Sequence, residues 1–66
     1  MTQFHIAVLD FNNYEVKMHK VDLEVEENQS EDEVVELFLS EHYNLDEIQF
    51  MYGQEPINID NEFYQD

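Results

Sequence analysis

Carboxylates are the residues of this sequence whose type and spacing could carry chemistry. The fifteen residues from 22 to 36 include eight acids: Asp22, Glu24, Glu26, Glu27, Glu31, Asp32, Glu33 and Glu36. Alternate residues of a strand lie about 6.6 Å apart, so Asp22, Glu24 and Glu26 would form a regular negative row that an exposed helix face continues. Regular negative charge is what a phosphate backbone presents to a basic groove. The run therefore predicts a surface that imitates nucleic acid.

The overall charge predicts a basic partner. The 66 residues include 17 Asp and Glu and only two Lys or Arg, for a net charge of −15. Such a surface repels nucleic acid and anionic membranes, and attracts basic proteins at rates that fall with salt. The alternative is a solvated coat, but solubility needs a net charge of magnitude about 2–8 in a small domain. We expect a basic, DNA-binding protein as the partner, with no direct binding to nucleic acid or membrane.

Other kinds of chemistry find little support. An EF-hand loop needs a Gly and a distant Glu, which residues 60–62 do not supply. The three His, at positions 5, 19 and 42, lack the spacing of a local zinc site. Neither Ser lies in a nucleophile turn, and a single Gly makes no phosphate-cradling loop. We expect no enzymatic activity, no cofactor and no metal site.

Length and composition predict one small folded domain. A chain of 66 residues without Cys is near the lower size limit for folding without disulfide bonds or a structural metal ion. Its hydrophobic fraction of 42% is too high for a disordered chain. We expect residues 1–66 to form a single domain, with about 60–66 as a loose tail in which Phe63 and Tyr64 could fold back. No segment resembles a signal peptide or a membrane span, which favours the cytoplasm.

Hydrophobic alternation predicts a β-hairpin. Residues 3–10 and 14–20 alternate on either side of a turn that contains two Asn. After Met18 the apolar residues shift from even to odd positions, which indicates a bulge near His19 and Lys20. Met18, Met51 and Tyr52 are candidates for the core.

The stretch Ser30–Tyr43 predicts an amphipathic helix. Ser30 caps its start, Asn44 ends it in the left-handed region, and one apolar stripe holds Val34, Val35, Phe38, Leu39 and His42. Residues 45–52 predict a third strand beside the first, and 57–59 a short fourth. We expect an α+β fold: a small antiparallel sheet of three or four strands (ββαβ or ββαββ) with the helix on one face.

The segment SEDEVVELFLSEHYNLDEIQFMYG, residues 30–53, resembles small open reading frames of phages and other mobile elements. In size and composition the chain is similar to phage-encoded DNA mimics, which inhibit host proteins such as uracil-DNA glycosylase, restriction enzymes, nucleoid proteins or CRISPR effectors. The resemblance implies a non-enzymatic inhibitor that occupies a basic groove of a protein in the host cytoplasm. No shared motif chooses among these targets.

The sequence leaves one other function open. The chain could be a small adaptor or dimerisation module that binds through an exposed strand edge and aromatic side chains, with the charge serving solubility. The second and last strands would be the edges, open to a second copy or another protein. Tyr52 is the aromatic side chain we expect as an anchor at such an interface.

Overall fold

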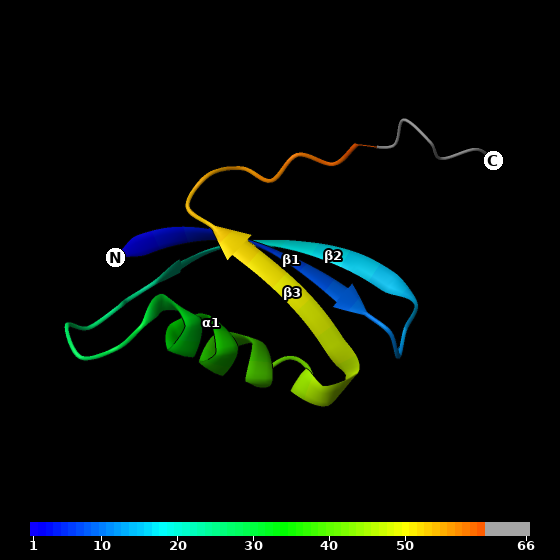
Figure 1. Cartoon of the computed structure of the whole chain (residues 1–66), viewed down its shortest axis with the longest axis horizontal. Helices are drawn as coiled ribbons and strands as arrows, with labels where there is room; N and C mark the ends of the chain where they lie inside the picture. Colours follow the sequence, from blue (N-terminus) through cyan, green and yellow to red (C-terminus); the bar gives the residue numbers. More distant parts are fainter. Residues whose placement is uncertain (61–66) are drawn as a thin grey trace.

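The computed structural model describes residues 1–60 as a three-stranded sheet with one helix against it (Figure 1). The elements are β1 (Thr2–Asp10), β2 (Glu15–Leu23), α1 (Glu31–Ser40), the 3₁₀ turn η1 (Leu45–Glu47) and β3 (Ile48–Gly53). The sheet order is β2-β1-β3, and both pairs are antiparallel. The predicted α+β fold, the order ββαβ and the edge positions of β2 and β3 are confirmed.

The C-terminal expectations have mixed outcomes. Residues 57–59 form no strand, so the sheet has three strands within the described part of the chain. The expected tail lies almost wholly outside the described residues, as do Phe63 and Tyr64. Among residues 1–60, no helix has the length and apolar character needed to cross a bilayer.

The core lies between α1 and one face of the sheet. The central strand β1 supplies Phe4, Ile6 and Val8, which are fully buried, because residues two apart on a strand share a face. From the other side α1 supplies Val35 and Leu39, also fully buried. Burial of each such side chain contributes about 1.5–3 kcal/mol to folding. The middle strand and the helix therefore hold the domain together.

The start of α1 agrees with the prediction and its end does not. Ser30 is the N-cap, and α1 ends at Ser40. The backbone N–H groups of His42 and Tyr43 donate to the carbonyl of Leu39, which closes the helix without a left-handed residue. Asn44 has φ −87° and accepts the N–H of Asp46 with its side chain, so it begins η1. The prediction of a left-handed stop at Asn44 was wrong.

The predicted bulge is also wrong. The β1–β2 register runs without a break from the pair Thr2–Leu23 to the pair Asp10–Glu15. The apolar pattern changes phase because the two faces of β2 have different surroundings. Val21 and Leu23 pack against the core, whereas Met18 lies on the other face and is exposed.

The hairpin turn is fixed by a buried carboxylate. Asp10 is 5% exposed and accepts the backbone N–H groups of Asn12 (3.0 Å) and Asn13 (3.1 Å) and the side-chain amide of Asn13 (2.9 Å). Hydrogen bonding from Asn13, chiefly by its side chain, holds the pKa of Asp10 below its ordinary value. Tyr14 completes the turn at φ 59°. The two Asn therefore do make the turn, with Asp10 as their anchor.

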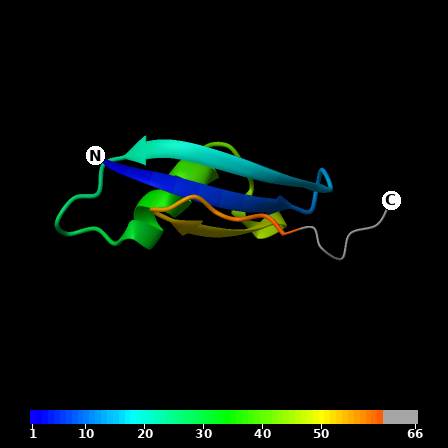
Figure 2. The same cartoon turned by 90° about the horizontal axis from the view of Figure 1, so that it is seen from above.

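Only one face of the sheet is covered by the helix. In Figure 1, α1 lies below the sheet, and residues 54–60 turn back on the opposite side. Viewed from above, these residues run over the β1–β3 side of the sheet (Figure 2). The molecule thus has a helix layer on one side of the sheet. The other face, which we call the uncovered face because no helix lies on it, has residues 54–60 over its β1–β3 side.

Candidate partner-binding surface

The first turn of α1 holds three carboxylates, Glu31, Asp32 and Glu33. Ser30 fixes this turn, because its Oγ accepts the backbone N–H of Glu33 at 3.2 Å. Negative side chains interact favourably with the N-terminal end of the helix dipole, which offsets part of their mutual repulsion. A dense group of acids is therefore held at a defined helix end.

β3 and the residues after it position two of these acids. The hydroxyl of Tyr52 donates a hydrogen bond to Oδ1 of Asp32, and Nε2 of Gln54 donates to Oε2 of Glu31 at 2.8 Å. The bond to Asp32 is the main cause that raises the pKa of Tyr52 to about 12. Both donors are neutral groups, so they orient the carboxylates without cancelling their charge.

Tyr52 lies beside the acids, as expected for a site residue, but it is not a free anchor. Its side chain is half-buried, and its ring packs edge-to-face on Phe4 with centroids 5.8 Å apart. Its hydroxyl already donates a hydrogen bond to Asp32. The structure therefore makes Tyr52 a positioning residue for Asp32 and brings it together with Glu31.

The outer side of α1 combines charge with apolar surface. Glu33 and Glu36 lie here with Leu37, which is 59% exposed. With Ser40 and Leu45 they line a shallow hollow of about 390 Å³. Lys and Arg have apolar stems and charged heads, so a surface that places leucines between carboxylates suits both parts of such side chains.

Three acids near the end of α1 and in η1 were not among the residues that the sequence predicted for the site. Glu41 is the C-cap of α1, and Asp46 and Glu47 belong to η1. The signal that could have found them is the complete absence of Lys and Arg after Lys20. Residues 31–47 hold seven carboxylates, which we call the helix-layer acids: Glu31, Asp32, Glu33, Glu36, Glu41, Asp46 and Glu47.

Asp22 lies on the other side of the molecule. It belongs to β2, where its neighbours Val21 and Leu23 pack against the core under α1. Successive side chains of a strand point to opposite faces. Asp22 is therefore on the uncovered face of the sheet, away from the helix-layer acids.

The same alternation continues beyond the end of β2. Val25 packs against the core, whereas Glu24 and Glu26 are exposed. We call Asp22, Glu24 and Glu26 the strand acids. Glu27 follows in an exposed turn that Gln29 closes by donating its N–H to the carbonyl of Glu26. The sequence left open whether the acids of the strand and of the helix share one face, and in the structure the strand acids and the helix-layer acids lie on different sides of the sheet.

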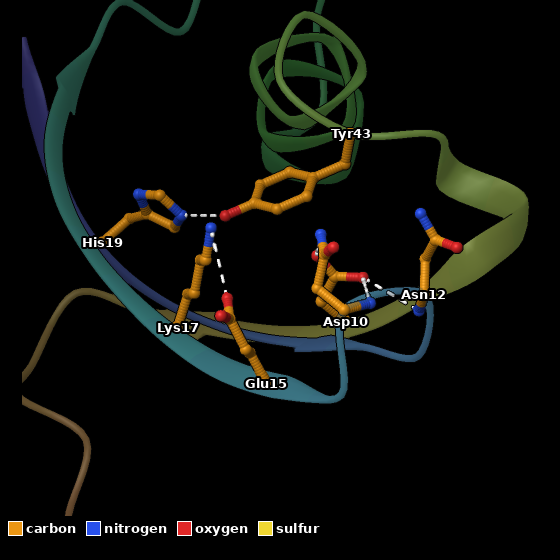
Figure 3. A network of polar contacts seen from close by, with 7 residues as sticks. Asp10, Asn12, Glu15, Lys17, His19 and Tyr43 are labelled. Atoms are coloured by element: carbon orange, nitrogen blue, oxygen red, sulfur yellow. Dashed lines mark hydrogen bonds and ion pairs between the residues drawn. The ribbon is translucent and has the colours of Figure 1, made fainter.

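The two Lys belong to β2, where Lys17 is on the helix side of the sheet and Lys20 is on the opposite face. Nζ of Lys17 is 3.4 Å from Oε2 of Glu15 and 6.0 Å from the ring centroid of Tyr43. Figure 3 shows Lys17 and His19 reaching from β2 toward Tyr43. Lys17 therefore pairs within this polar network, and no cation interrupts the carboxylates of residues 31–47.

His19 links β2 to the segment after α1. Its Nε2 lies 2.5 Å from the hydroxyl of Tyr43, and its ring packs on Phe38 with centroids 5.9 Å apart. Burial, followed by the charges of His42 and Lys17, lowers the pKa of His19. His42, which the sequence analysis placed in the apolar stripe of the helix, is exposed beside Phe38. The network is structural, since it joins elements of the core.

Among residues 1–60, no three or more His, Asp or Glu side chains are grouped so as to hold a metal ion. Compared with protein-family models, curated proteins and solved structures, the chain shows no match.

Proposed function

We propose that this protein is a non-enzymatic inhibitor that places its helix-layer acids in the basic, nucleic-acid-binding groove of another protein. The observation that carries the proposal is the run of seven carboxylates, without a Lys or Arg, along α1 and η1. A groove built to hold phosphates attracts such a surface at long range, at rates that depend on ionic strength. A phage-encoded protein of this kind would act in the host cytoplasm.

The charge density of α1 supports mimicry of a phosphate backbone. The helix has 10 residues and so is about 15 Å long. It carries four carboxylates, Glu31, Asp32, Glu33 and Glu36. One strand of B-DNA carries a phosphate per about 3.4 Å of axis, which is about four over the same length. α1 therefore matches a short row of phosphates in its number of negative charges, three of which are concentrated in its first turn.

The fixed positions of these acids also support the proposal. Ser30, Tyr52 and Gln54 each hold part of the first helical turn through a hydrogen bond. Groups that are already ordered lose less conformational entropy on binding. The exposed Leu37 adds apolar contact for the stems of basic side chains.

A capture experiment tests this function. The tagged protein is used to retain partners from host lysate, which are eluted with a salt gradient and identified by mass spectrometry. We expect one enriched DNA-binding protein that leaves at moderate salt and is displaced by duplex DNA. Retention of many basic proteins with none enriched would show that the charge is only a solubilising coat.

A second candidate function is strand addition at β2. This strand has nine residues and lies at the edge of the sheet, where no strand within residues 1–60 pairs with its outer side. An edge of this length can accept a strand of another protein. The partner would then stay bound at high salt and be lost when a Pro is introduced into β2. Indifference to that Pro in a folded variant would exclude this function.

A further inference from the structure

The hollow on the outer side of α1 brings apolar and acidic side chains together. Glu36, Leu37 and Ser40 follow Glu33 by three, four and seven residues, so all four share one face of the helix. Leu45, the first residue of η1, lines the same hollow of about 390 Å³. Leu37 and Leu45 are 59% and 37% exposed. The hollow therefore offers an incoming side chain both apolar contact and negative charge.

The two carboxylates of this hollow are available to a ligand. Within residues 1–60, neither the carboxylate of Glu33 nor that of Glu36 has a hydrogen bond or an ion pair. Those of Glu31 and Asp32, in the same helical turn, already accept hydrogen bonds. Residues three apart on a helix have Cβ atoms about 5–6 Å apart. One positive group between Glu33 and Glu36 can therefore contact both.

The polar side chains of the hollow offer acceptors and no donor. Carboxylates accept hydrogen bonds only. The hydroxyl of Ser40 donates to the carbonyl of Leu37 at 2.8 Å, so its oxygen has only lone pairs left to offer. A ligand that fits these groups must carry hydrogen-bond donors, and the two negative charges favour a cation.

Of the two strongly basic side chains in proteins, arginine fits this combination better. Its planar guanidinium carries five N–H donors, which can reach carboxylates on two edges, and its flat faces pack on other side chains. It is also more weakly hydrated than the compact ammonium group of lysine. We propose that the hollow holds an arginine side chain of the partner, with the guanidinium between Glu33 and Glu36 and the apolar stem over Leu37 and Leu45.

This inference rests on the proposed function and names the side chain by which the basic partner is recognised. The charge of the whole helix layer attracts a partner at long range. A few anchor residues, among which Arg is enriched, supply most of the binding free energy of an interface. An arginine in the hollow would be such an anchor, because the leucines exclude water from its contact with the carboxylates and so strengthen it.

Other hollows of the molecule suit an arginine less well. A hollow of about 240 Å³ at the hairpin includes Glu15, but Oε2 of Glu15 is 3.4 Å from Nζ of Lys17. Asp10 in the same hollow already accepts three hydrogen bonds. A hollow beside Tyr43 is lined by Lys17 and His19, and the charge of Lys17 repels a second cation. The hollow at Leu37 therefore has the charge complementarity that these two lack.

Leu37 is the side chain whose truncation should matter most. It also lines a second hollow, of about 220 Å³, which includes Phe38 and Glu41. Leu37 thus lies between two hollows that each contain a carboxylate. A basic segment that places its arginine beside Leu37 contacts this side chain on more than one side.

NMR titration of the full chain with labelled Leu methyl groups tests the site without a partner protein. The probes are the Nα-acetyl amides of arginine, lysine and citrulline, of which citrulline resembles arginine in shape but has no charge. We expect the signals of Leu37 and Leu45 to shift with arginine, less with lysine at the same concentration, and not with citrulline. The signals of Leu9, which is 42% exposed on the uncovered face, should not shift.

The acidic part of the site is tested by removing two charges at different places. Glu33→Gln/Glu36→Gln should abolish the shifts caused by arginine, because the guanidinium loses both of its negative partners. Asp22→Asn/Glu26→Gln removes the same number of charges from the strand acids and should leave these shifts nearly unchanged.

The apolar part is tested by the same substitution at two exposed positions, neither of which should unfold the domain. Leu37→Ser keeps every charge and should weaken binding to the captured DNA-binding protein by about tenfold or more. Leu9→Ser makes the same change on the uncovered face and should leave the affinity unchanged. Calorimetry at moderate salt measures both.

These experiments separate the arginine site from the proposed function. If the captured protein is displaced by DNA but binds Leu37→Ser as tightly as the wild type, the function holds and the arginine site is wrong. If no DNA-binding protein is captured but the arginine amide still shifts Leu37 and Leu45, the arginine site holds and the function is wrong.

The titration can also overturn the proposal by itself. Equal shifts with arginine and lysine would show that the hollow responds to charge alone. Equal shifts with arginine and citrulline would show that the carboxylates play no part. Shifts that survive Glu33→Gln/Glu36→Gln would place the arginine elsewhere on the surface.

Discussion

The hydroxyl of Tyr52 donates a hydrogen bond to the carboxylate of Asp32, which joins the edge strand β3 to the first turn of α1. The two residues are twenty positions apart in the sequence. The ring of Tyr52 also packs on Phe4 in the core. One side chain therefore connects the buried centre of the sheet to the acids that we propose as the binding surface.

Replacement of Tyr52 by Phe should change how stability depends on pH. The pKa of Tyr52 is raised from 10.0 to about 12 in the folded protein. A raised folded-state pKa gives stability that is present below pH 10 and lost as the pH rises toward 12. Denaturant unfolding across this range should show the loss in the wild type and a smaller loss in Tyr52→Phe. The exposed Tyr14 supplies the control, Tyr14→Phe, and equal pH dependence of all three proteins would contradict the role of Tyr52.

The N-cap of α1 can be tested through Ser30. Ser30→Ala removes the acceptor for the N–H of Glu33 and should cost about 1 kcal/mol. For a domain of this size that corresponds to a fall in Tm of about 4–8 °C. Ser40 donates to the carbonyl of Leu37 within the same helix, so Ser40→Ala should have little effect. Thermal unfolding followed by circular dichroism checks both, and equal Tm values would argue against the cap.

His19 should make the protein less stable in mild acid. Burial and the nearby His42 and Lys17 lower its pKa from 6.5. The folded state then takes up a proton less readily than the unfolded state, so stability is full above pH 6.5 and falls as the pH drops below it. Urea unfolding on either side of this pH should show a smaller difference for His19→Gln than for the wild type. The same difference in both proteins would show that His19 is not responsible.

The secondary structure and strand order could be predicted because they depend on local signals. The alternating pattern of apolar residues in 3–10 and 14–20 indicates a hairpin, and this inference does not depend on which element packs on it. The capping residue Ser30 and the apolar stripe of Val35 and Leu39 specify one helix, whose buried face needs a sheet. Three strands with one crossover leave few possible arrangements.

The side on which each side chain lies could not be predicted in the same way. The bulge predicted near His19 and Lys20 would have turned the apolar residues on both sides of it toward the core, whereas β2 is regular and has one face away from the helix. In a two-layer domain one helix covers one face, and Met18 lies on the other. Asp22 is on the same face of β2 as Met18, and so it lies on the side of the sheet opposite the helix-layer acids. Whether the odd-numbered or the even-numbered side chains of β2 face the helix depends on packing between distant parts of the chain. The sequence of one strand does not contain this information.

Some placements depend on contacts between distant parts of the chain. The sequence predicted Tyr52 both as a core candidate and as an anchor at an interface, but its partners, Phe4 and Asp32, come from other elements. Glu41, Asp46 and Glu47 are spaced too widely to stand out as an acidic run, and the fold adds them to the helix layer. The candidate site is therefore a product of the tertiary structure more than of the acidic run itself.

The most direct test of the account compares two charge reversals that differ only in location. Glu33→Lys/Glu36→Lys changes the helix layer and keeps the Ser30 cap, which bonds to the backbone of Glu33. Asp22→Lys/Glu24→Lys makes the same charge change on the opposite side. The affinity of each variant for the DNA-binding protein captured by the wild type is measured by calorimetry at moderate salt. We predict that the first pair abolishes binding and the second leaves it nearly unchanged; equal losses in both would mean that net charge, not the helix layer, attracts the partner.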